Sequence, residues 1–368
     1  MTALSIDAPA VPAASSGEDP TDIVVELTNV RRRFGDNHAL RDLSLTVPRR
    51  RITVLLGPNG AGKTTAIRMI TGALSSDGGT VSVFGMDPTT QGEQIRRRCG
   101  VVSAKPALYD RLSGYDNLAY SAELYGLGRG ATVGPRIRAS AARFGIEHAL
   151  TDQVGGYSTG MKTRLALARS VLHEPDLLLF DEPTSGLDPE SSHAVLEMIR
   201  EMTADGCTVV MCTHLLLEAE GLAEKVVVLE DGADVLSGTP VELIRRFWPT
   251  AVVQMDAEDR AGLDRCPDIP GVRSYQRAHG ATPAVIQVDD LRRVPDLVAA
   301  LTAAGVRLTR VEPHLPTLED LYFAVRGRRE IADDGGRQLT PVVAMARPPE
   351  QHAAPAPLHA VPATEGSR

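Results

Sequence analysis

A glycine-rich loop contains the strongest chemical signal in this sequence, Gly57-Pro-Asn-Gly-Ala-Gly-Lys-Thr-Thr65. Its spacing matches G-x-x-x-x-G-K-[ST], a pattern in which backbone N–H groups curl around phosphate oxygens. Lys63 is placed to reach the β- and γ-phosphates, and the Thr64 hydroxyl is placed to bind Mg²⁺. A chance glycine-rich turn is the alternative, but it would not explain the strand before the loop and the helix after it. The predicted phosphate site consists of Gly57, Asn59, Gly60, Ala61, Gly62, Lys63, Thr64 and Thr65.

Two adjacent carboxylates end a second apolar run, Leu177-Leu-Leu-Phe-Asp-Glu-Pro183. Asp181, at the end of a buried strand, is suited to hold Mg²⁺ through water. Glu182, one residue further on, is suited to act as a general base or to position an attacking water. A surface turn would contain the same pair of residues. The phosphate loop upstream in the same chain favours the metal and base interpretation.

Alternating strand-like and helix-like stretches place both motifs at strand ends. Ile52–Leu56 is a short apolar run that stops at Gly57, as a buried strand would. Ligands of α/β proteins bind outside the carboxyl ends of such strands, so this layout suits a bound phosphate. Further strands are predicted at Ile23–Val30, Leu43–Val47, Leu177–Phe180 and Thr208–Cys212, and helices at about 63–72, 189–203 and 215–223.

Composition divides the chain into four parts. Residues 1–20 and 327–368 are rich in Ala and Pro and are expected to form a disordered leader and tail. Residues 21–240 contain the motifs and include a mostly helical insert at about 88–172, with helices at Gln91–Arg98, Gly114–Tyr125, Gly134–Phe144 and Met161–Leu172. Residues 241–326 are expected to form a small α+β domain, with strands at Ala251–Met255, Ala284–Val288 and Arg307–Glu312 and helices at Val241–Phe247, Val294–Ala304 and Thr317–Val325.

The bulk composition favours a globular protein with no nucleic-acid partner. Hydrophobic residues make up 43% of the chain, and a formal net charge of −8 opposes binding to a phosphate backbone. The four cysteines have no zinc-ligand spacing, and Cys207 and Cys212 are expected to be buried thiols. No apolar run approaches the roughly 20 residues that span a bilayer. Any contact with a membrane is therefore expected to be peripheral.

Four further segments give these motifs a family resemblance. Tyr157-Ser-Thr-Gly-Met-Lys162 resembles the signature motif of ATP-binding cassettes, usually written LSGGQ, and Thr184-Ser-Gly-Leu-Asp188 resembles the D-loop of that family. Thr213-His214 resembles its switch histidine, and Phe34 stands where the family places an aromatic that stacks on adenine. Each has a plain alternative: a core histidine at His214, a buried aromatic at Phe34, and a helix N-cap at Ser158 or Thr159. Their order and spacing from about residue 24 to 240 favour the family interpretation.

This resemblance implies an α/β fold: a P-loop NTPase (RecA-like) core with an antiparallel β subdomain and a helical insert, followed by the small α+β domain. It implies ATP hydrolysis with Mg²⁺, with Glu182, His214 and Lys63 as catalytic residues and Thr64 and Asp181 at the metal. Two subunits, as a homo- or heterodimer, would enclose two ATP molecules, each between the phosphate loop of one subunit and the signature segment, with Ser158 and Gly160, of the other. Phe34 and Asp188 are further residues expected to bind the nucleotide.

The partner that the resemblance implies is a membrane permease of the ABC-2-like type, contacted by a loop within about 103–120 on the cytoplasmic side of the membrane. The signature variant and Arg310–Phe323 resemble exporter subunits of the drug-resistance type, which implies export of a drug, antibiotic or other hydrophobic compound. Two alternatives stay open: a regulatory cassette with little hydrolysis, and an exporter subunit for lipid or polysaccharide.

One position departs from the family pattern. Aligning Gly100–Tyr109 with the family's glutamine loop places Ala104 where a glutamine contacts Mg²⁺ and the attacking water. Ser103 has an oxygen but a shorter reach. We therefore expect slow but real hydrolysis, because Lys63, Asp181, Glu182 and His214 are all present.

Overall fold

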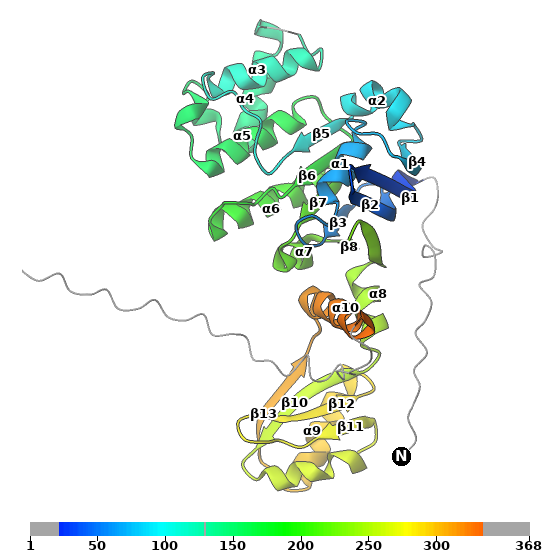
Figure 1. Ribbon diagram of the computed structural model, residues 1–368. Coiled ribbons are helices and arrows are strands. Elements are labelled where there is room, and N and C mark those ends of the chain that lie inside the picture. The colour runs from blue at the N-terminus through cyan, green and yellow to red at the C-terminus, as the bar shows by residue number, and fades with distance from the viewer. Residues whose placement is uncertain (1–21, 129, 334–368) are drawn as a thin grey trace, which may run out of the picture. The chain divides into compact units, whose positions relative to one another are not determined.

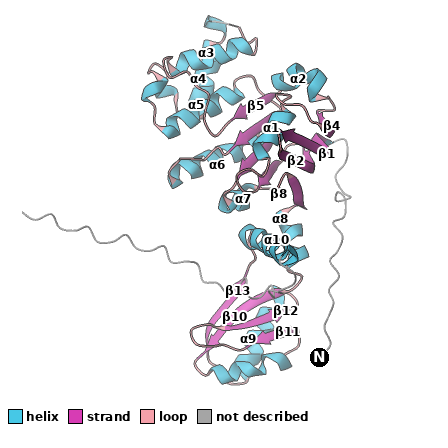
Figure 2. Cartoon of the chain, in the orientation of Figure 1, coloured by secondary structure: helices cyan, strands magenta, loops and turns pink. Residues whose placement is uncertain are grey.

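A computed structural model describes residues 22–128 and 130–333 of the chain. The predicted leader at 1–20 and the tail from 334 onward lie outside the described residues. Strands of the described part gather into one sheet of nine strands and one of four (Figures 1 and 2). None of the helices in residues 22–128 and 130–333 combines the length and the apolar character needed to cross a bilayer.

Parallel strands form the part of the large sheet that contains the two motifs. β3 (Ile52–Leu56) lies between β8 (Lys225–Glu230) and β7 (Thr208–Thr213), and β6 (Leu177–Asp181) and β5 (Cys99–Val102) follow at the edge. All five residues of β3 are buried, which is typical of a strand covered on both faces. The predicted strands at Ile52–Leu56, Leu177–Phe180 and Thr208–Cys212 thus lie beside one another.

Antiparallel strands extend the other side of this sheet. β1 (Ile23–Phe34) pairs with β2 (Asn37–Pro48) and β4 (Gly78–Val83), and β9 (Ala233–Gly238) pairs with β8. β4, β8 and β9 are not among the predicted strands, and the first predicted strand ends at Val30. In the structure β1 continues to Phe34 in a hairpin with β2, because Phe34 pairs with Asn37 across a turn at Gly35.

Helices connect the strands of the large sheet. α1 (Lys63–Ile70) follows β3, α6 (Pro189–Ala204) follows β6, and α7 (Leu216–Leu222) follows β7. Between β5 and β6 the chain forms α3 (Gly114–Leu124), α4 (Gly134–Arg143) and α5 (Thr159–Val171), which pack on one another. α2 (Pro88–Arg97) precedes β5, so the mostly helical stretch at 88–172 is interrupted by a strand of the large sheet.

The C-terminal part forms a separate antiparallel sheet in the order β11-β12-β10-β13. Its strands are β10 (Ala251–Ala257), β11 (Val272–Gln276), β12 (Ala284–Val288) and β13 (Leu308–His314). A core that includes Met255, Ile286 and Leu301 lies between this sheet and α9 (Val294–Ala303). Two helices flank the unit in sequence, α8 (Pro240–Phe247) and α10 (Leu318–Asp333), and the backbone of α10 continues past the predicted start of the tail at 327.

Candidate active site

Three neighbouring strand ends bring the two motifs together. In the register of the sheet Leu56 lies opposite Thr213, and Asp181 lies opposite Cys212. The residues that follow these strands, which are Gly57, Glu182 and His214, are therefore at the same edge of the sheet. A hydrogen bond from Glu182 N to Cys212 O, at 2.9 Å, fixes the first turn after β6. This edge of the sheet is where an α/β protein places its ligand.

The glycine-rich loop needs glycine at two of its positions. A Cβ at Gly57 would lie 2.3 Å from the Leu229 carbonyl oxygen, and one at Gly62 would lie 2.8 Å from the Ala39 carbonyl oxygen. Gly62 also has φ +105°, a conformation that L-residues rarely adopt. α1 begins directly afterwards at Lys63, so its positive N-terminal end faces the space that the loop encloses.

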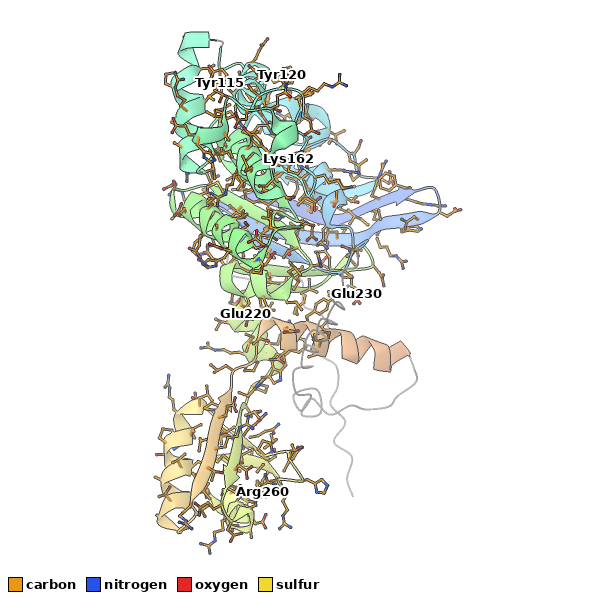
Figure 3. The ribbon with its side chains drawn as sticks, turned by 90° about the vertical axis from the view of Figure 1, so that its left-hand side faces the viewer. Tyr115, Tyr120, Lys162, Glu220, Glu230 and Arg260 are labelled. Atoms are coloured by element: carbon orange, nitrogen blue, oxygen red, sulfur yellow. The ribbon has the colours of Figure 1, made fainter. Side chains whose placement is uncertain are left out.

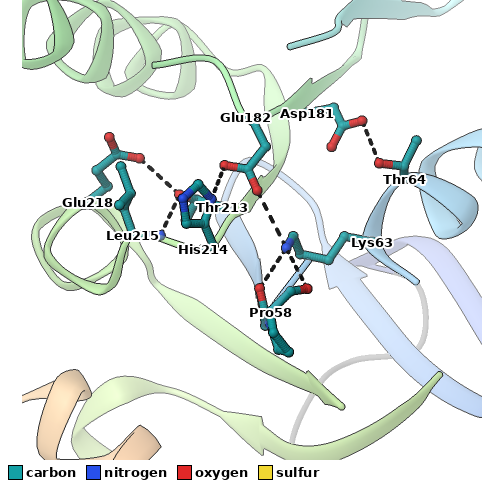
Figure 4. A network of polar contacts seen from close by, with 10 residues as sticks. Pro58, Lys63, Thr64, Asp181, Glu182, Thr213, His214, Leu215 and Glu218 are labelled. Atoms are coloured by element: carbon teal, nitrogen blue, oxygen red, sulfur yellow. Dashed lines mark hydrogen bonds and ion pairs between the residues drawn. The ribbon is translucent and has the colours of Figure 1, made fainter. Parts of the chain in front are cut away.

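Lys63 is directed into this loop, where it is only 6% exposed. Its ammonium group donates hydrogen bonds to the carbonyl oxygens of Gly57 at 2.6 Å and Pro58 at 3.2 Å. The same Nζ lies 3.5 Å from Oε1 of Glu182 (Figure 4). Residues 119 positions apart are thereby brought within ion-pair distance at the mouth of the loop.

Two side-chain pairs join the loop and strand ends. The Thr64 hydroxyl donates to Asp181 Oδ2 at 2.8 Å, and His214 Nδ1 lies 2.7 Å from Glu182 Oε2 (Figure 4). Glu182 also has φ +54°, a left-handed conformation that costs a non-glycine residue about 1–3 kcal/mol. Among the residues that the structure describes, Oε1 of Glu182 has no hydrogen-bond partner, because the contact with Lys63 is an ion pair without hydrogen-bond geometry. Backbone strain together with a buried carboxylate oxygen that makes no hydrogen bond is typical of a functional position.

A pocket of about 320 Å³ opens between the glycine-rich loop and the two carboxylates. Most of the predicted site residues line it, and Ala104 lies in the same wall. Asn37 and Ala39 also line it and were not predicted from sequence. Their one signal is that they follow Phe34 closely, at the start of β2 in the β1–β2 hairpin. The lining residues are Phe34, Asn37, Ala39, Pro58, Asn59, Gly60, Ala61, Gly62, Lys63, Thr64, Thr65, Ala104, Asp181 and Glu182.

Phe34 forms the outer end of this pocket. Its side chain is 45% exposed, so the expectation of a buried core aromatic does not apply. The guanidinium of Arg32 lies 4.8 Å from the ring centroid, within the distance of a cation–π contact. Arg32 in turn forms an ion pair with Asp77 at 2.7 Å, which holds the guanidinium in place beneath the ring.

Five predicted site residues are not among those that line this pocket: Gly57 and His214, which lie at the strand ends beside it, and Ser158, Gly160 and Asp188. Ser158 caps α5 by accepting from Met161 N at 3.2 Å, and Asp188 caps α6 by accepting from Ser191 N at 2.9 Å. The hydrogen bonds from Ser191 lower the pKa of the Asp188 carboxyl group. A Cβ at Gly160 would lie 3.6 Å from Ser191 Oγ, so the N-terminal ends of α5 and α6 are neighbours. Ser158, Gly160 and Asp188 form a second group, and the N-cap alternative for Ser158 is correct for its local geometry.

Ala104 and Ser103 supply no polar group to the pocket. The Ala104 methyl group has no hydrogen-bonding atom, and the Ser103 hydroxyl donates to the Lys105 carbonyl oxygen at 3.0 Å. The Ala104 side chain therefore adds only an apolar surface to the pocket that Asp181 and Glu182 also line.

Known proteins are similar to this chain in sequence. The ABC transporter family matches residues 40–185. The chain is 37% identical to the ABC transporter ATP-binding protein NatA of Bacillus subtilis over 220 residues, which is 58% of this chain and 89% of the relative. It is 32% identical to the daunorubicin/doxorubicin resistance ATP-binding protein DrrA of Streptomyces peucetius over 317 residues, 84% of this chain and 94% of the relative.

Solved structures show the same fold. An ATP-binding subunit of an ABC transporter is 31% identical with a TM-score of 0.56, covering 61% of this chain and 93% of that chain. A dimeric cassette in a post-hydrolysis state with ADP and Pi is 25% identical with a TM-score of 0.53, covering 58% of this chain and 98% of that chain. The predicted P-loop NTPase fold is thus confirmed. The chain belongs to the family of ABC transporter ATP-binding proteins, which are ATPases.

Proposed function

We propose that this site hydrolyses ATP and that Glu182 is the base that activates the attacking water. The observation that supports this role is the position of its carboxylate at the end of β6. Oε2 contacts His214 Nδ1 at 2.7 Å, and Oε1 lies 3.5 Å from Lys63 Nζ without a hydrogen bond. A carboxylate oxygen beside the lysine that would bind the terminal phosphate is available to accept a proton from water.

The residues around Thr64 fit a magnesium ion. Mg²⁺ prefers oxygen ligands and is bound through one or two protein side chains together with nucleotide phosphates. The Thr64 hydroxyl and Asp181 Oδ2 are 2.8 Å apart at the pocket wall and provide this kind of donor set. When bound, the ion would neutralise charge that develops on the phosphates. Lys63 would contact the β- and γ-phosphates from the other side of the loop.

The nucleotide base would stack on Phe34. Arg32 lies 4.8 Å from the ring centroid and restrains it from below, while 45% of the Phe34 surface is exposed. An exposed aromatic ring at the end of a phosphate-binding pocket provides a face for a planar heterocycle. His214 would contact the γ-phosphate with its imidazole while Nδ1 stays bonded to the Glu182 carboxylate.

Two copies of such a subunit would complete each site. Ser158, Gly160 and Asp188 lie outside the pocket of their own chain, yet two helix N-terminal ends meet there. Neighbouring helix N-termini attract phosphate oxygens through their unpaired N–H groups. We therefore place this group against the γ-phosphate bound by a partner subunit, in a homo- or heterodimer.

A groove beside α3 suits the permease. It has a volume of about 240 Å³ and exposes Tyr109 and Tyr120, whose rings meet edge to face at 5.3 Å. Lys162 of the signature segment forms a 2.9 Å ion pair with Asp110, next to Tyr109 in the groove wall. Tyr120 and Lys162 both belong to the helical part of the chain (Figure 3). A displacement of residues 103–120 by a permease helix would therefore be transmitted to α5 through the Lys162–Asp110 ion pair.

Export of a drug or antibiotic, at the cytoplasmic side of the membrane through an ABC-2-like permease, is the proposed task. Relatives named for daunorubicin/doxorubicin resistance and for linearmycin resistance align with 84% and 83% of this chain, which includes its C-terminal part. We propose that residues 241–326 act as an accessory domain of the same subunit. A regulatory cassette with little hydrolysis is the second candidate, which the apolar wall at Ala104 favours.

Glu182→Gln tests the proposed reaction. The amide keeps the shape of the side chain but cannot accept a proton, so hydrolysis should fall by a factor of about 100 or more. ATP binding should remain, and the ATP-bound dimer should accumulate in size-exclusion chromatography with MgATP. Glu201→Gln, the same change on an exposed position of α6, is the matched control. Full hydrolysis by Glu182→Gln would contradict the assignment of the base.

A further inference from the structure

One buried hydroxyl group connects the end of β7 to α7. Thr213 is 0% exposed, and its Oγ1 accepts a hydrogen bond from Leu215 N at 3.0 Å. The same hydroxyl donates to Glu218 Oε2 at 3.0 Å, and Glu218 is itself only 9% exposed (Figure 4). Because a backbone N–H can only donate, the hydroxyl accepts from Leu215 and its own proton is left for Glu218. The backbone after His214 is thereby attached to the helix that follows it.

His214 lies between Thr213 and Leu215, within the segment that these hydrogen bonds hold. Its imidazole is 42% exposed, so packing contributes little to its orientation. The N-cap of α7 is Leu215, whose side chain has no atom that could cap the helix. Nevertheless, Nδ1 of His214 lies 2.7 Å from Oε2 of Glu182, 32 positions away in the chain. Besides this contact, the backbone of residues 213–215, which the Thr213 hydroxyl ties at Leu215 N, sets where the ring starts.

We propose that Thr213 and Glu218 are positioning residues for His214 and, through it, for the Glu182 carboxylate. The Thr213 hydroxyl is already bonded to Leu215 N and Glu218, and both side chains are buried, so neither is expected to touch substrate. The inference rests on the proposed function, because it assigns both residues a part in that hydrolysis. It also gives the burial of the Glu218 side chain a role, since a buried polar group needs a hydrogen-bond partner.

Valine at position 213 separates the hydroxyl from the shape of the side chain. Thr213→Val keeps the β-branched shape and removes both hydrogen bonds, which frees the turn that bears His214. In the full-length chain with MgATP we expect kcat to fall by about tenfold, with KM for ATP changed by less than about twofold. Thr213→Ser and Glu218→Gln, which keep a hydroxyl and an acceptor oxygen, should recover most of the rate, whereas Glu218→Leu should resemble Thr213→Val.

Thr208 provides a matched control on the same strand. It lies at the start of β7, is 1% exposed, and its hydroxyl accepts from Arg50 N at 3.0 Å. Thr208→Val therefore removes a buried hydroxyl from β7 without touching the turn at His214. We expect it to lower the melting temperature and to leave kcat per folded molecule unchanged.

Introducing the same substitution into the His214→Ala variant distinguishes a positioning role from general destabilisation. If Thr213 acts through His214, Thr213→Val should change the residual rate of His214→Ala by less than about twofold, because coupled residues are not additive. Equal losses in both backgrounds, or a Thr213→Val enzyme that keeps its kcat and only melts earlier, would overturn the inference. Full activity of both Glu182→Gln and His214→Ala would instead contradict the proposed function itself.

Discussion

The carboxylate of Glu182 and the imidazole of His214 meet at 2.7 Å across the ends of two neighbouring parallel strands. This contact occupies Oε2 and leaves Oε1 buried beside Lys63, without a hydrogen bond from any described residue. One carboxylate thus has a positioned oxygen and an available one. The division matches what a general base needs, namely a fixed orientation and a free site for a proton.

Ala104→Gln should raise the rate of hydrolysis. The substitution would place an amide in the wall of the pocket that Asp181 and Glu182 also line, where it could orient the metal and the attacking water. We expect kcat to increase by about tenfold in steady-state ATPase assays of the subunit with its permease. Ala299→Gln, on an exposed position of α9, controls for the substitution itself. An unchanged kcat would show that position 104 does not limit turnover.

Phe34→Ala should weaken nucleotide binding rather than chemistry. Loss of the ring removes a stacking surface worth about 0.5–1.5 kcal/mol, so KM for ATP should rise by about 2- to 12-fold. Phe34→Tyr retains the ring and should stay near the original KM. Phe323→Ala removes a similarly exposed aromatic in α10 and is the control. A fall in kcat with an unchanged KM would argue against stacking at this position.

Lys63→Ala and Gly160→Asp should complement each other when their subunits are mixed. Each variant alone damages both sites of a homodimer, the second by placing a negative charge beside the partner's phosphate. In a mixed dimer both lesions fall in one site, and the other site is intact. ATPase activity should therefore reappear on mixing, up to about half of the original rate per mixed dimer. Mixing Lys63→Ala with Lys63→Met should restore nothing, and recovery there would refute shared sites.

Alkaline pH should destabilise the fold partly through Cys99. Burial raises the pKa of this thiol from 9.0 to about 12, so the folded chain keeps a proton that the unfolded chain loses above about pH 9. Stability is therefore fully present below pH 9 and falls as pH rises, by at most about 1.4 kcal/mol per pH unit from this group. Urea unfolding between pH 7.5 and 10 should show a shallower pH slope for Cys99→Ala. Cys207→Ala, at a less buried thiol, should change the slope less, and equal slopes for all three proteins would contradict the prediction.

Local sequence was sufficient for the individual parts of the site. The glycine spacing of residues 57–65 can be recognised from sequence because the backbone there requires glycine, as the close approach of Leu229 O to Gly57 confirms. Apolar runs predicted β3, β6 and β7 well, because strands buried on both faces are apolar throughout. The apolar and buried β8 was nevertheless missed, as was β11 (Val272–Gln276), whose residues are all partly or fully exposed.

Pairings between distant segments could not be predicted in the same way. Nothing local in Thr213 or Glu218 indicates that a single hydroxyl would join them and hold the turn at His214. Nor does the sequence around Ala104 reveal that Ser103 donates to Lys105 O instead of facing the pocket. Such contacts depend on strand order and register, which are set by packing of the whole sheet.

The sequence by itself determined the chemistry of this protein, because residue types and their spacing specify which groups can bind a phosphate, a metal and a proton. Only the tertiary structure decided which of those groups meet. It placed Glu182 between His214 and Lys63, and it put Ser158, Gly160 and Asp188 outside the pocket of their own chain. The physical reason is that the strand ends are brought together by burial of β3, β6 and β7 in one sheet, a cooperative property of the entire core.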